Sequence, residues 1–299
     1  MAAANTIIIF GPTAVGKSEL AVKLAKKIGA EIISADSMQV YRGMDIGTAK
    51  PTAEEKQGIP HHLIDIRDPN EDWTVSDFIE ETNRLIAQPP RKIIAGGTGL
   101  YLWSLLEGFS FPIAEADPAL REKLKKEPLD KLYQRLKEID PAAAEKIHAN
   151  DKKRIVRALE VFELTGKPIS KVQEEARPRG SVSGFPHILI GLSLPREVLY
   201  KKIEERIDQM AKNGLIEEVK GLLANGCSKD LKSFQALGYK EVCEYLDGKW
   251  SKEEMVAELK KRTRNFSKRQ MTWLKRFKDV KWFSPPVDSR EILDYINDI

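Results

Sequence analysis

The sequence lacks the features that mark membrane proteins, disulfide-rich proteins and zinc proteins. Its two cysteines, Cys227 and Cys243, are too few for a disulfide framework or a zinc site. No window approaches the roughly 18 apolar residues of a membrane span. The N-terminus runs directly into an apolar strand pattern, unlike a cleaved signal. We therefore expect a cytoplasmic globular protein without membrane association, and a monomer by default.

Acidic residues are absent from one stretch near the C-terminus. Lys260–Lys278 (KKRTRNFSKRQMTWLKRFK) holds nine Lys and Arg, although the whole chain of 299 residues carries a net charge of only +4. A basic block on an otherwise mildly acidic chain indicates a polyanionic partner, with a solvated helix face as the alternative.

A phosphate-binding motif stands at the start of the chain. The apolar run Thr6–Phe10 leads into GPTAVGKS, and a helical pattern follows until Gly29. This is G-x-x-x-x-G-K-[ST] in its strand–loop–helix context, so backbone N–H groups should converge on an anion. Lys17 would add a charge and Ser18 a hydroxyl for a metal ion. The predicted cradle comprises Gly11, Pro12, Thr13, Ala14, Val15, Gly16, Lys17 and Ser18.

Polar residues follow two further strand patterns. Asp36 and Gln39 come after the short strand Ala30–Ser34, and Thr98 follows the strand Lys92–Ala95 through a glycine-rich turn. Carboxyl ends of strands line the ligand crevice of open α/β sheets, so these residues should lie near the cradle. The fold class predicted is α/β, a parallel P-loop NTPase-like sheet flanked by helices.

The middle of the chain shows only helical periodicity. From Asp117 to about Arg177 no strand pattern occurs, and strand character returns at His187–Leu194. We therefore predict an inserted helical subdomain at residues 113–186 within a core of residues 1–112 and 187–299. His61–Ile66 resembles a short strand, Phe234–Leu246 and Lys252–Lys278 resemble helices, and Val280–Phe283 resembles an edge strand.

Two classes of function fit the motif. The first is a kinase or another ATP- or GTP-binding enzyme, which usually has a Walker-B aspartate after a second buried strand. The strand Lys92–Ala95 ends in glycines instead, and Asp65 follows a poor strand pattern. Asp36 is the best-placed carboxylate, and it suits a general base for a hydroxyl or for another nucleophile.

The second class is a nucleic-acid-modifying transferase whose loop holds a diphosphate leaving group. On the long helix, Lys261, Arg264, Lys268 and Lys275 share one face, opposite the apolar residues Leu259, Phe266, Trp273 and Phe277. A second basic cluster, Asn150–Arg157, places cations in the first turn of a helix, where the macrodipole disfavours them. A phosphate backbone would compensate for that cost.

Several motifs together resemble the bacterial tRNA dimethylallyltransferases, also called tRNA isopentenyltransferases. They span nearly the whole chain: GPTAVGKS, DSMQVYRGMDIGTAKP, HHLID, GGTGLYLWSLLEG, KRIVRALEVFELTGKP, SFQALGYKE and TRNFSKRQMTWLKRF. The resemblance implies transfer of a dimethylallyl group from dimethylallyl diphosphate to the exocyclic amine of the adenine 3′ to the anticodon, with Mg²⁺. Its alternatives are a small-molecule kinase and an adenylate isopentenyltransferase acting on free nucleotide.

The resemblance also implies roles for individual residues. Asp36 matches the general base, and Gln39 would hold the flipped-out adenine. Thr13 and Lys17 would stabilise the departing diphosphate, and Ser18 would bind Mg²⁺. The tRNA anticodon stem-loop is the expected partner. The residues that match tRNA-binding positions are Asp36, Ser37, Met38, Gln39, Thr98, Arg121, Lys153, Arg154, Ile155, Arg157, Gln235, Gly238, Lys268, Arg269 and Gln270.

Overall fold

The structure is a computed structural model that describes residues 6–107, 117–175 and 185–298. Contacts divide the chain into two compact units, Met1–Trp103 with Phe185–Ile299, and Ser104–Gly184. We call them the core unit and the helical unit. Of the predicted domain boundaries, residue 113 lies outside the described residues, and residue 187 is the first residue of a strand.

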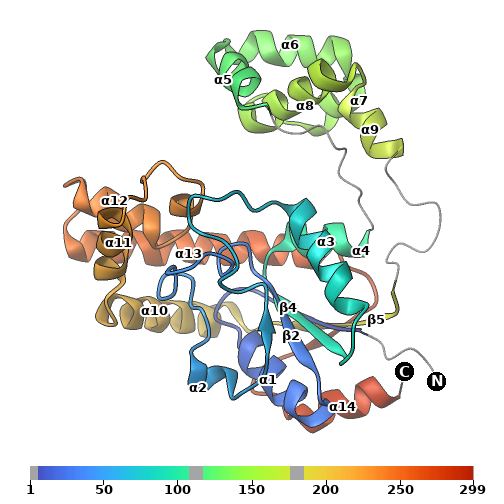
Figure 1. Ribbon diagram of the computed structural model, residues 1–299, viewed down its shortest axis with the longest axis vertical. Coiled ribbons are helices and arrows are strands. Elements are labelled where there is room, and N and C mark those ends of the chain that lie inside the picture. The colour runs from blue at the N-terminus through green and yellow to red at the C-terminus, as the bar shows by residue number, and fades with distance from the viewer. Residues whose placement is uncertain (1–5, 108–116, 176–184, 299) are drawn as a thin grey trace. The chain divides into compact units, whose positions relative to one another are not determined.

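A parallel sheet of six strands forms the centre of the core unit (Figure 1). Its order is β3-β2-β4-β1-β5-β6, and every pairing is parallel. The strands are β1 (Thr6–Phe10), β2 (Glu31–Ala35), β3 (His61–His62), β4 (Lys92–Gly96), β5 (His187–Leu192) and β6 (Val280–Phe283). The central strands are buried apolar runs, as parallel strands covered on both faces require. The predicted α/β fold and edge strand are confirmed.

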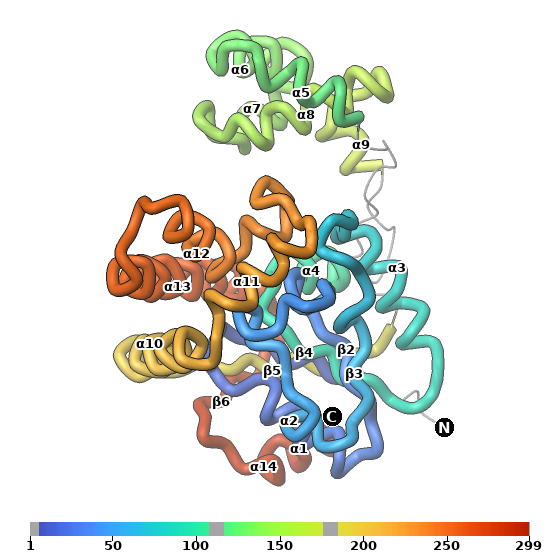
Figure 2. Tube along the Cα trace, turned by 60° about the vertical axis from the view of Figure 1, so that its left-hand side comes forward, coloured from blue at the N-terminus to red at the C-terminus, as the bar shows by residue number. Residues whose placement is uncertain are grey.

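Helices cover both faces of this sheet. Figures 1 and 2 place α1 (Lys17–Ile28) and α14 (Ser289–Asn297) on one side, and α3 (Val75–Ile86), α4 (Gly99–Leu106) and α13 (Lys252–Leu274) on the other. The remaining helices of the core unit are α2 (Ala53–Lys56), α10 (Arg196–Lys212), α11 (Leu215–Ala224) and α12 (Tyr239–Leu246). No helix in the described part of the chain is long and apolar enough to cross a membrane.

Three predicted elements are shorter than expected. The strand at His61 stops after two residues, because Leu63 and Asp65 have φ of 61° and 56° and cannot stay extended. The helix expected from Phe234 begins at Tyr239, since Gly238 has φ 93° and interrupts it. The long helix ends at Leu274 rather than Lys278. These shorter lengths leave the ends of β2 and β4, and the face of α13 at the site, close to where the sequence predicted them.

Between residues 117 and 175, the helical unit contains five helices. They are α5 (Pro118–Lys126), α6 (Leu129–Ile139), α7 (Pro141–Lys146), α8 (Lys152–Thr165) and α9 (Ile169–Glu175). Helix α8 packs against α5 and α6 around a core that includes Leu132, Leu136, Ile155 and Leu159. The predicted all-helical character of this segment is confirmed over its described residues.

Candidate active site

The segment Gly11–Ser18 forms the loop between β1 and α1. Ala14 and Gly16 adopt left-handed backbone angles, with φ of 64° and 98°. Alternation of left- and right-handed residues turns successive N–H groups inward, which creates an anion-binding concavity at the start of α1. Gly11 is required here, because a Cβ would lie 2.6 Å from the carbonyl oxygen of Leu192 on the neighbouring strand.

Lys17 bends back over the loop. Its Nζ donates to the carbonyl oxygen of Pro12 at 2.8 Å. Burial and the nearby Arg206 guanidinium lower its pKa to about 8, partly offset by the Asp36 carboxylate. Lys17 is thus a buried cation near a second cation, and the loop beside it turns its N–H groups inward. The loop is therefore electrostatically prepared for a ligand of negative charge.

Asp36 follows the last residue of β2, at the carboxyl edge of the sheet. Its Oδ1 accepts the Met38 N–H at 2.9 Å, which fixes the carboxylate in the turn. Burial raises its pKa, against the opposing effects of the Met38 N–H, Lys17 and the Gln39 N–H. The carboxylate lines the pockets described below, with protein on its other sides. A carboxylate with a raised pKa is a suitable proton acceptor near neutral pH.

Two pockets of different character meet at these residues. A small polar pocket of about 100 Å³ contains Lys17, Ser18 and Gly96. A larger pocket of about 400 Å³ has a mainly apolar wall that includes Ile207 and Leu259. The residues that line both are Thr13, Asp36, Thr48, Ala49, Arg206 and Phe266. The site thus has an anion compartment and an apolar compartment, with Asp36 and Thr13 at the junction.

Arg206 is a site residue that the sequence analysis missed. It lies on α10, lines both pockets, and its Nη1 reaches the hydroxyl of Thr13 at 3.5 Å. In the sequence it is one of several charged residues in a polar helical pattern. The sequence signal for this residue is its position between Ile203 and Ile207, which places a cation at the border of the buried face of α10.

The side-chain amide of Gln39 hydrogen-bonds to other residues of the protein. Its Oε1 accepts the Ser34 hydroxyl at 2.9 Å, and its Nε2 donates to the carbonyls of Thr48 and Ala49 at 3.4 and 3.3 Å. Gln39 lines the small pocket only. It therefore ties the end of β2 to the pocket wall, whereas its predicted contact with adenine remains a prediction.

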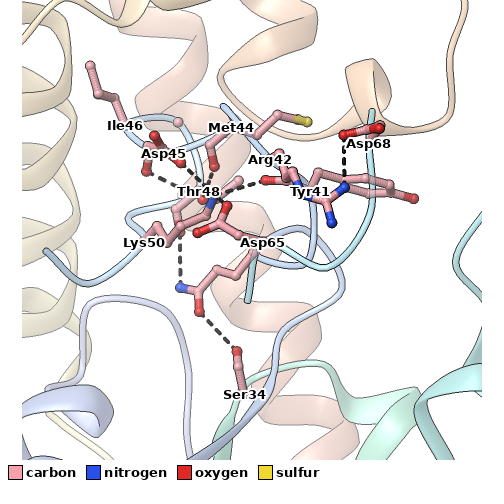
Figure 3. Close-up of polar contacts among 12 residues, drawn as sticks. Ser34, Tyr41, Arg42, Met44, Asp45, Ile46, Thr48, Lys50, Asp65 and Asp68 are labelled. Carbon is pink, nitrogen blue, oxygen red and sulfur yellow. Dashed lines mark hydrogen bonds and ion pairs between the residues drawn. The ribbon is translucent and has the colours of Figure 1, made fainter. Parts of the chain in front are cut away.

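The segment Tyr41–Lys50 is held by a buried lysine (Figure 3). Lys50 Nζ donates to the carbonyl of Tyr41 at 2.8 Å and lies 2.5 Å from carboxylate oxygens of both Asp45 and Asp65. Only 5% of its side chain is exposed. Asp65 thus pairs with Lys50, which leaves Asp36 as the carboxylate that lines the small pocket.

A glutamate on α11 fixes the same segment from the other side. The Glu218 carboxylate accepts the N–H groups of Asp45, Ile46 and Gly47 and the hydroxyl of Tyr239. Gly47 has no room for a side chain, because a Cβ would lie 2.5 Å from the Tyr239 ring. Glu218 and Lys50 together make the wall at Thr48 and Ala49 rigid.

Other predicted substrate residues line the larger pocket. Thr98 accepts the Ser37 N–H on its hydroxyl at 3.2 Å, which joins the turns after β4 and β2. The remaining predicted residues on this wall are Ser37, Met38, Gln235, Gly238 and Arg269. The structure thus brings together segments that lie more than 200 residues apart in the chain.

The basic block on α13 divides into two halves. Its N-terminal cations are in ion pairs: Lys260 with Asp208, Lys261 with Glu258, Arg262 with Glu241, Glu244 and Glu258, and Arg264 with Glu204. Lys268 and Lys275 are exposed and have no carboxylate partner within the described ranges. Gln270 is buried, between the loop Gly11–Ser18 and the turn after β4.

In the helical unit, the predicted arginines surround one carboxylate. Glu160 is 0% exposed and accepts Arg121 Nε and Arg157 Nη1, both at 2.8 Å. Burial opposes its ionisation, but these two arginines hold its pKa below the usual value. Ile155 is also buried, in the hydrophobic core. Lys153 and Arg154 are exposed in the first turn of α8, where Arg154 pairs with the capping Asp151.

Any metal ion in this site would need oxygens of the bound ligand to complete its coordination. Over residues 6–107, 117–175 and 185–298, no cluster of three or more His, Cys, Asp and Glu side chains is arranged to hold an ion. Ser18 lines the small pocket, and its hydroxyl makes no hydrogen bond to another described residue. One hydroxyl suits Mg²⁺, which keeps several waters and takes further oxygens from bound phosphates.

Comparison with known proteins gives a consistent result. The family profile described as IPP transferase matches residues 39–277. The tRNA dimethylallyltransferase of Caldanaerobacter subterraneus is 50% identical over 94% of this chain and 92% of its own length, and that of Pelotomaculum thermopropionicum is 48% identical over 92% and 89%. The crystal structure of a tRNA isopentenylpyrophosphate transferase from Bacillus halodurans superposes with a TM-score of 0.73 at 42% identity, covering 99% of this chain and 95% of the other.

A structure titled as a eukaryotic dimethylallyltransferase acting on tRNA superposes with a TM-score of 0.84. It is 29% identical, and the match covers 98% of this chain and 80% of that one.

Proposed function

Because this chain belongs to the IPP transferase family, with the bacterial tRNA dimethylallyltransferases as its relatives, we propose that it prenylates tRNA. It transfers the dimethylallyl group of dimethylallyl diphosphate to the exocyclic amine of the adenine 3′ to the anticodon. The observation that carries this proposal is the junction of an anion pocket and an apolar pocket at Thr13 and Asp36. The anion pocket suits the leaving diphosphate, and the apolar pocket suits the hydrocarbon that is transferred.

The small pocket receives the diphosphate. The N–H groups of the loop, Lys17 and Arg206 supply positive charge where negative charge develops as the C–O bond breaks. The Thr13 hydroxyl lies at the junction and is placed to donate to the bridging oxygen. An allylic carbon tolerates positive charge, so stabilisation of the leaving group should dominate the barrier.

Asp36 removes the proton from the attacking amine. Its carboxylate borders both pockets, so a base that enters the larger pocket brings its amine next to the allylic carbon. The nitrogen forms the new C–N bond, the diphosphate takes the bonding electrons, and Asp36 accepts the proton. The adenine has to leave its stack to reach this depth.

Mg²⁺ is the proposed cofactor, with the Ser18 hydroxyl as its protein ligand. When bound, it would neutralise charge on the diphosphate oxygens. The chain's own residues hold the diphosphate from the other sides, through Lys17 and Arg206.

The anticodon stem-loop is the proposed macromolecular substrate. Lys268, Lys275 and Arg269 of the core unit, and Lys153 and Arg154 of the helical unit, are exposed cations suited to phosphate contacts. We propose a monomer as the active form. We place the reaction in the cytoplasm, where tRNA is processed.

Label transfer tests this proposal against its alternatives. The protein is incubated with unmodified tRNA and dimethylallyl diphosphate labelled in the prenyl group, and in parallel with AMP as acceptor. We expect label in the tRNA and not in AMP. Label transfer to AMP alone would support an enzyme of free nucleotides, and transfer of phosphate from ATP to a metabolite without prenylation would support a kinase.

A further inference from the structure

The side chain of Gln270 bridges two segments that lie far from it in the sequence. Its Oε1 accepts the Thr13 N–H at 2.9 Å, and its Nε2 donates to the Gly97 carbonyl at 3.0 Å. The sequence separations are 257 and 173 residues. Gln270 is 7% exposed and also forms part of the wall of the small pocket.

The orientation of this amide follows from its partners. An N–H faces one end and a carbonyl oxygen faces the other, so only one orientation makes both hydrogen bonds. The site is built closely around it, because a Cβ on Gly97 would lie 2.4 Å from Gln270 Nε2. Both polar atoms are thus engaged with the backbone of the core unit.

We propose that Gln270 is a positioning residue that acts through Thr13. By holding the Thr13 N–H, it removes this donor from the anion cradle and fixes the Thr13 hydroxyl at the junction of the two pockets. The inference rests on the proposed function, since it assigns the Thr13 hydroxyl to the leaving diphosphate. It differs from the sequence-based expectation that Gln270 contacts tRNA.

The neighbours of Gln270 on α13 are suited to the tRNA contact instead. Lys268 and Arg269 are exposed, and Arg269 lines the larger pocket. Two faces of the same helix therefore have separate tasks. The exposed face carries the cations, and the buried Gln270 sets the geometry of the phosphate-binding loop from inside the fold.

The first test uses Gln270→Met and Gln270→Asn. Methionine keeps the volume but offers neither a strong donor nor a strong acceptor. Asparagine keeps the polarity but is one methylene too short to bridge both partners. A misplacement of about 1 Å at a reacting group can cost about a hundredfold in rate. We expect kcat to fall by about ten- to a hundredfold in both variants, with Kd for tRNA within about twofold of wild type.

The second test is a double-mutant cycle with Thr13→Ala. If Gln270 acts through the Thr13 hydroxyl, Gln270→Met should lower kcat by less than about twofold when that hydroxyl is already absent. Multiplicative losses in kcat would overturn the inference, because two independent roles give additive free energies. Urea denaturation of each variant separates these losses from unfolding, and Gln270→Asn completes a second cycle if Gln270→Met is unstable.

A matched comparison on the same helix distinguishes the two roles. Lys268→Ala should raise Kd for tRNA and lower the salt dependence of binding by about one unit. If Gln270→Met behaves like Lys268→Ala, the residue is a tRNA contact. If wild type transfers label but Gln270→Met matches it in kcat, this inference fails alone; if wild type transfers no label, the proposed function fails.

Discussion

The core unit and the helical unit use charged side chains in opposite ways. In the two pockets of the core unit, Lys17, Asp36 and Arg206 face space that a ligand can fill. In the helical unit, Arg121 and Arg157 face a carboxylate that is completely buried. Buried charges in the first group cost folding free energy, and a bound ligand of opposite charge would offset that cost. The charges of the second group pair with each other and so stabilise the fold itself.

The basic block Lys260–Lys278, on α13 and the residues after it, shows both uses within one stretch of chain. Arg262 and Arg264 are bound to glutamates of neighbouring helices, and further along the chain Lys268 and Lys275 are exposed. Cations that look equivalent in the sequence thus differ in availability. The number of basic residues in a block overstates the number of phosphates that it can bind.

The largest effect that we expect is that of Asp36→Asn. The amide keeps the shape and the hydrogen bond to Met38 but accepts no proton from the amine. Loss of a general base typically costs about 10²–10⁴-fold in rate. The measurement is kcat for label transfer, alongside tRNA affinity, which should stay within a few fold. A collapse of affinity with little change in kcat would make Asp36 a binding residue.

Lys17→Ala tests the lysine that lines the small pocket. Removal of one donor to developing negative charge costs about 3 to 4 kcal/mol in transition-state stabilisation, and we expect a similar loss in kcat/KM. The thermal stability should rise slightly or stay constant, because Lys17 is a desolvated cation in the empty protein. A large fall in thermal stability would show that Lys17 serves the fold, as Arg121 does.

In the helical unit, Glu160→Gln should act on stability. Breaking a buried ion pair costs about 3 to 5 kcal/mol, since charged partners are left unpaired. The matched control is Glu163→Gln, whose half-exposed pair with Arg135 should contribute less than about 1 kcal/mol. Urea denaturation of the whole chain measures both. Equal costs for the two variants would contradict the structural role of Glu160.

The stability of the helical unit should depend on pH through the carboxylate of Glu160. The folded-state pKa of Glu160 is lower than the unfolded value, so its ionised form stabilises the fold above the unfolded pKa. This contribution disappears as pH falls through the folded pKa. Wild type should therefore lose more stability between about pH 5 and acid conditions than Glu160→Gln, as measured by urea denaturation at each pH.

The exposed cations of the basic block Lys260–Lys278 should determine the salt dependence of tRNA binding. Replacing Lys268, Lys275 and Arg276 by Ala should lower the slope of log K against log salt by about one unit for each phosphate that is no longer bound. Arg264→Ala serves as the control and should change the slope little, because its charge is already paired with Glu204. Equal changes in slope for Arg264→Ala and for a single Lys268→Ala would remove the distinction between paired and available cations.

The smallest expected effect is a fall in kcat/KM on the alkaline side of the pH profile. Lys17 is charged below its pKa of about 8 and loses its charge above it. In the opposite direction, Asp36 must be ionised, so activity rises with pH through its raised pKa. We expect kcat/KM for dimethylallyl diphosphate to fall above about pH 8. Lys17→Arg should move this limb to higher pH if it retains activity.

Much of this site was predictable from local patterns. The loop Gly11–Ser18, the carboxyl ends of two strands at Asp36 and Thr98, and the helical insertion all have signals within short windows. These signals depend on glycine, on β-branched runs and on helical periodicity. The structure places Asp36 and Thr13 at the common border of both pockets.

Residues that depend on distant partners were not predictable in this way. Arg206 reaches Thr13 across 193 residues, and Glu218 binds a segment more than 170 residues away. Gln39 and Gln270 stand in motifs, but their hydrogen bonds are set by packing that the motif does not specify. Sequence patterns predicted the candidate site, whereas tertiary packing decides which side chains line its pockets.

Nucleoside mass spectrometry of tRNA treated with dimethylallyl diphosphate tests the central claim most directly. The assay compares wild type with Asp36→Asn at equal tRNA occupancy. The account predicts dimethylallyl adenosine 3′ to the anticodon with wild type, and its near absence with Asp36→Asn. Unmodified tRNA after incubation with folded wild type, or an unreduced yield with Asp36→Asn, would contradict it.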